Sequence, residues 1–204
     1  MRVAALYDVH AMPWALEAVL AEVDADRIVF GGDLVDGPYD DETLELARSV
    51  DAVWIRGNCE DAYDWGRDLP LAVDLDGVTY CHATPTDNTP ITTAITPDED
   101  LVRLFGESGT FVIGHSHHQF DRRVGGLRVV NAGSVGMAYE DDVAAYWTLV
   151  EDGEPRFMRT PFDVDLAVAR VRASSWPGAE EFVAGNLLVA QSRDEAIAYF
   201  ESER

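Results

Sequence analysis

The sequence contains no lysine, so arginine supplies all 15 basic residues against 38 aspartates and glutamates. The formal net charge is -23 at pH 7. Binding a long nucleic acid requires cations that neutralise backbone phosphates, so this balance argues against such a partner. The acidity fits either adaptation to high salt, where surface carboxylates maintain hydration, or a coding bias towards Asp, Ala and Arg.

Cysteines and long apolar runs are also scarce. Cys59 and Cys81 are too few for a disulfide framework, and we expect both to be free thiols. The apolar run at residues 3–6 is too short for a signal peptide, and no later stretch reaches membrane-spanning length. We therefore expect a cytoplasmic protein without a membrane partner.

The chain has 204 residues, of which 47% are hydrophobic, enough for one sizeable core. We expect a single domain over residues 1–204. Short apolar runs alternate with helical patterns in the first third, which is typical of an α/β protein whose strands are buried on both faces. The predicted strands are 3–7, 28–30 and 53–55, and the predicted helices are 13–23 and 42–49.

The rest of the chain predicts hairpins followed by helices. Asp76-Gly77 and Gly125-Gly126 are turn dipeptides between apolar runs, and Glu151-Asp152-Gly153 separates two more. The predicted strands are 72–75, 78–81, 110–113, 122–124, 127–130, 144–150 and 155–160. The predicted helices are 98–105, 164–173, 179–190 and 194–202, and we expect residues 161–204 to form a helical layer packed on the core. The Thr- and Pro-rich segment 84–97 is expected to be a mobile loop.

Polar residues cluster where these strands end. All five histidines lie at or just beyond a predicted strand end, alongside further carboxylate and amide side chains. Open α/β sheets place their sites beyond the carboxyl ends of strands, so these segments can converge. The set comprises Asp8, His10, Asp33, Asn58, His82, His115, His117 and His118.

Mixed carboxylate, imidazole and amide groups suit borderline divalent ions such as Mn²⁺, Fe²⁺, Ni²⁺ or Zn²⁺. Seven such groups, with His118 set aside, exceed the needs of one ion. Two ions roughly 3.5–4 Å apart need a bridging anion, for which the Asp33 carboxylate is our candidate.

Five motifs, taken in order, resemble the calcineurin-like metallophosphoesterase superfamily over residues 3 to about 136. They are Asp8-Val9-His10, Gly32-Asp33-Leu34-Val35-Asp36, Gly57-Asn58-Cys59-Glu60, His82 and Gly114-His115-Ser116-His117. The resemblance implies a four-layer αββα sandwich with a dinuclear metal centre.

The same resemblance implies a ligand set. One metal would take Asp8, His10, Asp33 and His117, and the second would take Asp33, Asn58, His82 and His115. Mn²⁺ is our first choice, with Fe, Ni and Zn as alternatives. A bridging water or hydroxide would be the nucleophile, because two cations lower its pKa and stabilise the charge that develops on the phosphate.

Cys59 departs from the commonest pattern, in which a histidine at this position protonates the leaving group. A thiol is a poorer acid at neutral pH, so the proton could come from water or Glu60, or the leaving group could depart unaided. A branch of small prokaryotic members with cysteine here is known mainly as phosphodiesterases. We therefore predict hydrolysis of a small phosphodiester, with Asp33, Asn58, Cys59 and His82 as catalytic residues.

Two other functions are alternatives: a phosphomonoesterase acting on nucleotides or proteins, and a non-catalytic scaffold of the same fold. Members of the family that this sequence resembles form dimers and larger assemblies, so a homo-oligomer is a further possibility for this chain.

Several neighbouring residues have two interpretations. His118 supports the ligands or lies at the surface, and Asp36 orients the Asp33 loop or caps the next segment. Arg56 meets a substrate phosphate or forms a salt bridge. Residues 131–136 form a glycine-permitted loop or support the metal site. Tyr63 and Trp65 line a cleft or are buried.

Overall fold

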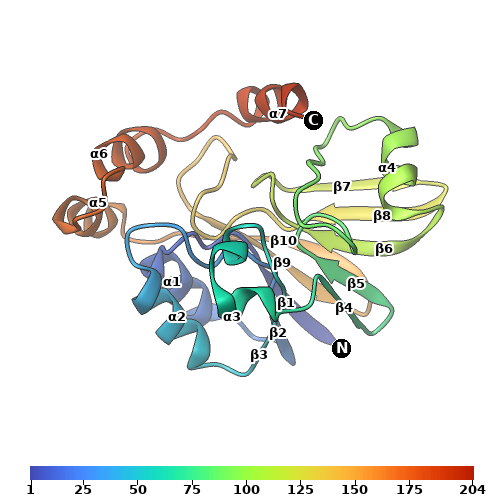
Figure 1. The fold of residues 1–204 in the computed structure, drawn as a ribbon, viewed down its shortest axis with the longest axis horizontal. Coiled ribbons are helices and arrows are strands. Elements are labelled where there is room, and N and C mark those ends of the chain that lie inside the picture. The colour runs from blue at the N-terminus through green and yellow to red at the C-terminus, as the bar shows by residue number, and fades with distance from the viewer.

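The computed structural model describes all 204 residues (Figure 1). In chain order its elements are β1 (Arg2–Leu6), α1 (Pro13–Glu22), β2 (Arg27–Phe30), α2 (Asp40–Arg48), β3 (Ala52–Trp54), the 3₁₀ turn η1 (Cys59–Ala62), α3 (Asp64–Arg67), β4 (Ala72–Leu75), β5 (Val78–Cys81), α4 (Asp98–Phe105), β6 (Ser108–Ile113), β7 (Phe120–Val124), β8 (Gly126–Asn131), β9 (Ala145–Glu151), β10 (Glu154–Thr160), α5 (Val164–Ala173), α6 (Ala179–Phe182), the π-helical turn η2 (Val183–Leu187) and α7 (Arg193–Ser202). No helix is both long and apolar enough to span a bilayer.

The strands form two five-stranded mixed sheets. The first has the order β10-β9-β1-β2-β3, with β1, β2 and β3 parallel. The second has the order β4-β5-β6-β8-β7, with β5, β6 and β8 parallel. The antiparallel strands β9, β10, β4 and β7 lie towards the edges. Each sheet therefore has a parallel core, whose strand ends can carry a shared site.

Alternation along the strands sends side chains to different layers. In β1, Val3 and Ala5 face the space between the sheets, whereas Ala4 and Leu6 face the helices that cover the first sheet. In β6, Val112 faces the other sheet and Phe111 faces α4. The strands are therefore buried on both faces, as their near-continuous apolar sequence predicts.

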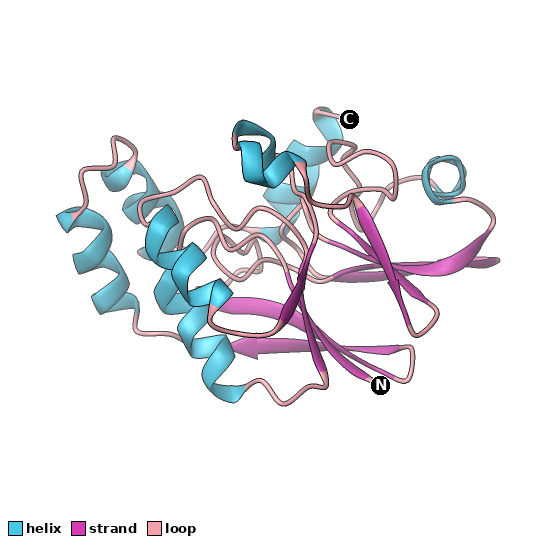
Figure 2. Cartoon of the chain, turned by 60° about the horizontal axis from the view of Figure 1, so that its bottom comes forward, coloured by secondary structure: helices cyan, strands magenta, loops and turns pink.

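Three hydrophobic clusters hold the layers together. One joins α1, α2 and part of the C-terminal segment to the first sheet, a second fills the space between the sheets, and the third joins α4 to the second sheet. Figure 2 shows helices on both sides of the strands, with most of them grouped on one side. The predicted four-layer αββα sandwich is confirmed.

Local sequence signals set several boundaries. Pro13 occupies the first turn of α1, where its missing N–H costs no hydrogen bond. The side chains of Asp163 and Ser192 accept from backbone N–H groups at the starts of α5 and α7. Asp76 and Gly77 both have positive φ, at 53° and 79°, which matches a tight turn of the primed type between β4 and β5.

The C-terminal residues are helical, as predicted, but they form two groups. Ala167 and Val171 of α5, and the segment that continues through α6 and η2, pack into the cluster on the first sheet. The predicted helix 179–190 is α-helical only over Ala179–Phe182, continues as a π-helical turn and ends at Leu187. α7 lies apart, between α6 and α4 (Figure 1), where Glu201 bonds to Thr93 and Thr96.

Candidate metal centre

The seven predicted ligands converge, because each lies in a loop that follows a parallel strand. Asp8, Asp33 and Asn58 follow strands of the first sheet, and His82 and His115 follow strands of the second. The two sets of loops are joined directly: the His115 N–H donates to Oδ2 of Asp8, at 3.0 Å. Two further ligands, His10 and His117, lie two residues beyond Asp8 and His115.

The backbone at this edge is strained. Five of the seven predicted ligands have positive φ, between 47° and 69°, in the left-handed region that non-glycine residues rarely adopt: Asp8, His10, Asp33, His115 and His117. Such conformations cost about 1–3 kcal/mol each and concentrate at functional sites. This concentration supports a functional role for these loops independently of side-chain chemistry.

One group of ligand atoms comprises Asp8, His10 and His117. Nε2 of His10 lies 3.2 Å from Nε2 of His117, which is 3.4 Å from Oδ1 of Asp8. That Asp8 oxygen is buried and has no hydrogen-bond donor. An unpaired buried carboxylate oxygen is costly, so the geometry fits a cation beside it.

A second group comprises Asp33, His82 and His115, with Asn58 beside it. Nε2 of His82 lies 3.2 Å from Nδ1 of His115 and 3.1 Å from Oδ1 of Asn58. Oδ2 of Asp33 is 3.5 Å from His82 Nε2 and 3.9 Å from His10 Nε2. One carboxylate oxygen therefore faces both groups, while Oδ1 accepts from the Cys59 N–H.

Backbone carbonyls orient three of the histidine rings. Nδ1 of His82, Nε2 of His115 and Nδ1 of His117 contact the carbonyl oxygens of Gly31, Thr89 and Met137, at 2.9–3.1 Å. A carbonyl oxygen only accepts, so these nitrogens carry the hydrogens. In neutral rings the opposite nitrogens present lone pairs to the site, and this is the arrangement typical of metal-bound histidine.

The electrostatics also favour cations at the site. Burial lowers the pKa of His115 to about 4 and that of His10 below its ordinary value, so both rings are neutral at pH 7. Burial would also lower the pKa of His82, but Asp33 and Asp8 outweigh it and raise that pKa. Burial opposes ionisation of Asp8, yet the neighbouring histidines hold its pKa well below the usual range. Nitrogen and oxygen atoms with lone pairs thus face one another, a donor set that fits borderline divalent ions.

Glycines make room for the carboxylates. A Cβ on Gly57 would lie 2.2 Å from Oδ1 of Asp33, and one on Gly114 would lie 2.4 Å from Oδ2 of Asp8. Neither distance is compatible with a side chain. These glycines are therefore required by close approach rather than by turn geometry.

Glu60 holds the Asp33 loop and is fully buried. Its Oε2 accepts from the Asp33 and Gly57 N–H groups, and its Oε1 accepts from the Leu34 N–H, all at 2.7–2.8 Å. Both oxygens are engaged with the backbone. The alternative in which Glu60 protonates a leaving group is therefore unsupported, and the residue is a structural clamp.

Cys59 is half-buried beside the site and belongs to a further group of possible ligands with His10 and Asp33. Its Sγ lies 3.8 Å from Oδ2 of Asp36, which is exposed. Burial, together with Asp33 and Asp36, raises the pKa of the thiol, so it stays protonated. Asp36 does not cap α2; instead Oδ1 of Asp40 accepts from the Asp36 and Gly37 N–H groups.

The loop after β8 supports the metal-binding loops. Asn131 Nδ2 donates to the Gly114 carbonyl at 2.6 Å, and Ser134 Oγ donates to the Asp8 carbonyl at 2.7 Å. These contacts favour the supporting role over a purely structural one. His118 is buried, donates to the Ser116 carbonyl and accepts from the Ala94 N–H, so it supports the site and is not at the surface.

Two other expectations have clear outcomes. Arg56 pairs with Asp61 and donates to the Arg67 carbonyl, which is the salt-bridge alternative. Tyr63 and Trp65 are half-buried and line a surface cavity of about 580 Å³ beside α2.

Segment 84–97 is tied down along its length, which does not fit the expected mobile loop. Asn88 Nδ2 donates to the Gly57 carbonyl, the Thr89 carbonyl accepts from His115, and the Thr92 carbonyl accepts from Ser116.

Sequence reasoning missed the groups that orient the ligands. The carbonyls of Gly31, Thr89 and Met137 carry no sequence signal, because every residue has one. Tyr139 was also missed: its ring stacks on His117, with centroids 5.2 Å apart and planes 20° apart.

Comparisons with known proteins agree with this geometry. A sequence profile of the calcineurin-like phosphoesterase superfamily domain matches residues 1–153. No curated protein matches the chain. Among solved structures, the chain is similar to a metallophosphoesterase from Sphaerobacter thermophilus, with a TM-score of 0.70 and 23% identity over 84% of this chain and 93% of that one.

Two further structures are more distant. Yfce, a phosphoesterase from E. coli, has a TM-score of 0.53 and 18% identity, and a Vps29 mutant from Entamoeba histolytica has a TM-score of 0.50 and 20% identity. Each match covers 80% of this chain and 100% of the other. Likeness at these identities shows the fold alone.

The sandwich and its cluster at the strand ends define a protein of the metallophosphoesterase type. The chain belongs to the calcineurin-like phosphoesterase superfamily, whose profile covers 153 of its 204 residues. The predicted family is confirmed, while membership of the branch marked by Cys59 stays a prediction.

Proposed function

We propose that this protein hydrolyses a small phosphodiester with the help of two divalent metal ions, Mn²⁺ in the first place. The observation that carries this proposal is the single Asp33 oxygen that faces both ligand groups. Bound there, two ions would lower the pKa of a water molecule and stabilise negative charge on a phosphate.

The chain's own contribution is to hold the ligands and admit the ester. Asp8 and His82 are fully buried, whereas Asn58, Cys59 and His115 are only half-buried. Substrate access is therefore from the side of Asn58 and Cys59. No lysine exists and Arg56 is engaged, so the acidic chain offers the substrate anion little attraction apart from the metals.

The residue at the proton-donor position and the net charge of the chain both bear on the kind of ester that would be cleaved. The Cys59 thiol, with its raised pKa, is a weak acid beside a leaving oxygen. The enzyme would therefore act best on esters whose leaving group departs with little protonation. A diester also brings one negative charge fewer than a monoester dianion into a surface of net charge -23.

The test is hydrolysis by protein stripped of metal and then reloaded with Mn²⁺, Fe²⁺, Ni²⁺ or Zn²⁺. We expect metal-dependent cleavage of bis(4-nitrophenyl) phosphate, faster than that of 4-nitrophenyl phosphate. Faster cleavage of the monoester would establish the phosphomonoesterase alternative. No turnover with any metal would overturn the proposal.

The fold similarity to Vps29 fits the second candidate, a non-catalytic scaffold. The two functions predict opposite effects of Asp33→Ala. Hydrolysis is lost if Asp33 joins two metals, whereas a scaffold keeps its affinity for its partner. The complete ligand set favours the enzyme.

A further inference from the structure

A pocket adjoins the candidate metal centre on the side of His117. The Met137 carbonyl accepts from Nδ1 of His117, and the Tyr139 ring stacks on the His117 ring. Met137 and Tyr139 also line a cavity of about 330 Å³. This volume is at the small end of the range for ligand pockets. One aromatic ring thus separates the cavity from a predicted metal ligand.

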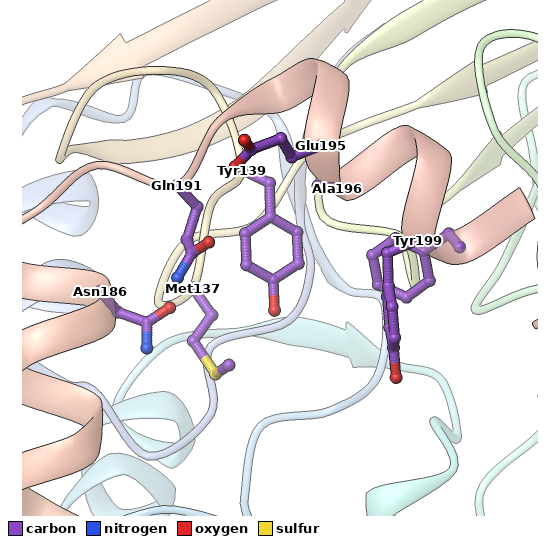
Figure 3. Close-up of a pocket in the computed structure, with 8 residues that line it drawn as sticks. Met137, Tyr139, Asn186, Gln191, Glu195, Ala196 and Tyr199 are labelled. Atoms are coloured by element: carbon purple, nitrogen blue, oxygen red, sulfur yellow. The ribbon is translucent and has the colours of Figure 1, made fainter. Parts of the chain in front are cut away.

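The far wall of this pocket comes from α7 and the segment before it. Figure 3 shows the Tyr139 ring between Met137 and Gln191 on one side and Tyr199 on the other. Phe200 extends the aromatic wall, with its ring centroid 5.9 Å from that of Tyr139. The superfamily profile ends at residue 153, so this wall is built by a part of the chain outside the match.

Several contacts fix α7 over the loops of the site. At the start of α7, the Arg193 guanidinium pairs with Glu140, and the Arg193 backbone N–H donates to Oδ1 of Asp141 at 3.0 Å. At its end, Glu201 bonds to Thr93 and Thr96, and Arg204 pairs with Asp100. The pocket is therefore held from both sides and does not depend on a free helix end.

The lining selects the chemistry of an occupant. Tyr139, Tyr199 and Phe200 offer ring faces and edges, while Asn186 and Gln191 offer amide groups. Glu195 places a carboxylate at the rim, which disfavours a second anion. A neutral planar ring with hydrogen-bonding edges meets all three conditions.

We propose that this pocket binds the base of a nucleoside phosphodiester while the phosphate lies at the metal centre. The inference rests on the proposed function and names its substrate class. Stacking on aromatic side chains and amide contacts would bind the base on the His117 side of the metal centre. The phosphate would then extend from the base over the centre, which is accessible at the half-buried Asn58 and His115. The pocket therefore determines specificity through KM.

The test keeps the leaving group constant. Thymidine 5′-(4-nitrophenyl phosphate) and methyl 4-nitrophenyl phosphate release the same phenolate, and only the first carries a base. We expect a lower KM for the thymidine ester. Ala196→Phe, which fills the pocket from α7, should raise that KM about tenfold, or about 1.4 kcal/mol of binding, with kcat unchanged. The methyl ester should be cleaved by this variant as by the parent.

A second variant guards against misfolding by the first. Tyr199 is 60% exposed, so Tyr199→Ala removes a wall of the pocket without opening the core. It should raise the KM of the thymidine ester severalfold. Phe157→Ala is the matched control, because Phe157 is an exposed aromatic residue, 43% accessible, on β10 and outside the pocket.

A binding measurement separates the pocket from catalysis. Metal-free protein should give saturation-transfer NMR signals from thymidine, and Ala196→Phe should abolish them. Equal KM values for the two esters, unchanged by both variants, would overturn the inference while leaving the phosphodiesterase in place. Failure of both esters to react would instead overturn the proposed function, and the NMR result would still decide whether the pocket binds a base.

Discussion

His82 and His115 approach each other through ring nitrogens that have no hydrogen between them in the neutral state. Nε2 of His82 lies 3.2 Å from Nδ1 of His115, while their other nitrogens bond to the carbonyls of Gly31 and Thr89. Two facing lone pairs repel unless a proton or a metal cation lies between them. Oδ2 of Asp33 lies 3.5 Å from Nε2 of His82 and Oδ1 of Asp8 lies 3.9 Å from its Nδ1, and these carboxylates raise the pKa of His82 against the effect of burial.

This relationship predicts that metal binding stabilises the fold. Adding Mn²⁺ to stripped protein at one hundred times its dissociation constant should stabilise each site by about 2.7 kcal/mol. Calorimetry should show a higher Tm with Mn²⁺, and the Tm should return to that of the stripped protein when a chelator is added. Asp33→Ala, which removes the oxygen shared by both groups, should lose most of this increase.

The matched control for that substitution is Asp68→Ala. Asp68 is exposed and belongs to neither ligand group. It should keep the full metal-induced shift in Tm. An equal shift in Asp33→Ala and the parent protein would contradict a shared carboxylate.

Gly57→Ala should damage metal binding and also destabilise the fold, because the added Cβ would lie 2.4 Å from the Asp33 backbone nitrogen. The added Cβ would lie 2.2 Å from Oδ1 of Asp33, so the carboxylate must move away from His82 and His10. We expect Mn²⁺ affinity, measured by isothermal titration calorimetry, to fall by tenfold or more, about 1.4 kcal/mol. Gly185→Ala, where the nearest atom to the new Cβ is 3.5 Å away, should leave the affinity unchanged.

Glu60→Gln tests the clamp on the Asp33 loop. The amide group of glutamine would turn an N–H towards a backbone N–H that now donates to a carboxylate oxygen. An unsatisfied buried donor costs about 1–3 kcal/mol, and hydrogen bonds to a charged acceptor are the stronger ones. Urea denaturation should show a loss of this size. Glu45→Gln, on the exposed face of α2, should show almost none.

Short apolar runs and turn dipeptides made most of the fold predictable. The strands on either side of Asp76-Gly77 and the ends of β1, β2 and β6 lie within a residue or two of their predicted positions. The ligands follow those ends, so their convergence follows from parallel pairing. The sequence identified Gly57 as part of a motif. The reason that a glycine is required there, its close approach to the Asp33 carboxylate, could be seen only in the structure.

Long-range relationships were beyond sequence reasoning. The sequence around Glu60 does not indicate that its carboxylate accepts hydrogen bonds from three N–H groups in two loops. The sequence of segment 84–97 likewise does not indicate that His115 and α7 hold it in place. The short η1 and α3 turns lack the periodicity that identifies longer helices. Val183 and Leu187 of η2 pack into the cluster on the first sheet, and apolar periodicity does not predict a π-helical path there.

Cys59→His should change the dependence of hydrolysis on the leaving group. Histidine titrates near neutral pH and can donate a proton that the thiol, with its raised pKa, holds. Under the proposed function, diesters with alkyl leaving groups should be cleaved at least about tenfold faster, while 4-nitrophenyl esters change little. Cys59→Ser is the control of similar size. A uniform effect on both ester types would contradict this role for the position.

Arg193 is predicted to control the mobility of α7. Its guanidinium pairs with Glu140, whose side chain is only 8% exposed, and it also donates to the Gln119 carbonyl. Arg193→Ala leaves the Glu140 carboxylate without its charged partner, although the Gln119 N–H still donates to it. Losing one member of a buried pair costs about 3–5 kcal/mol, and the cost is smaller here because the Arg193 side chain is 31% exposed. We expect much of that cost to be avoided by release of α7, because the freed carboxylate can then reach water. Amide hydrogen exchange in residues 194–202 should therefore become faster while exchange in β1 and β6 is unchanged.

Arg172→Ala is the control, since Arg172 pairs with the exposed Glu180. Unchanged exchange in α7 of Arg193→Ala would show that the contacts of Glu201 and Arg204 hold the helix by themselves.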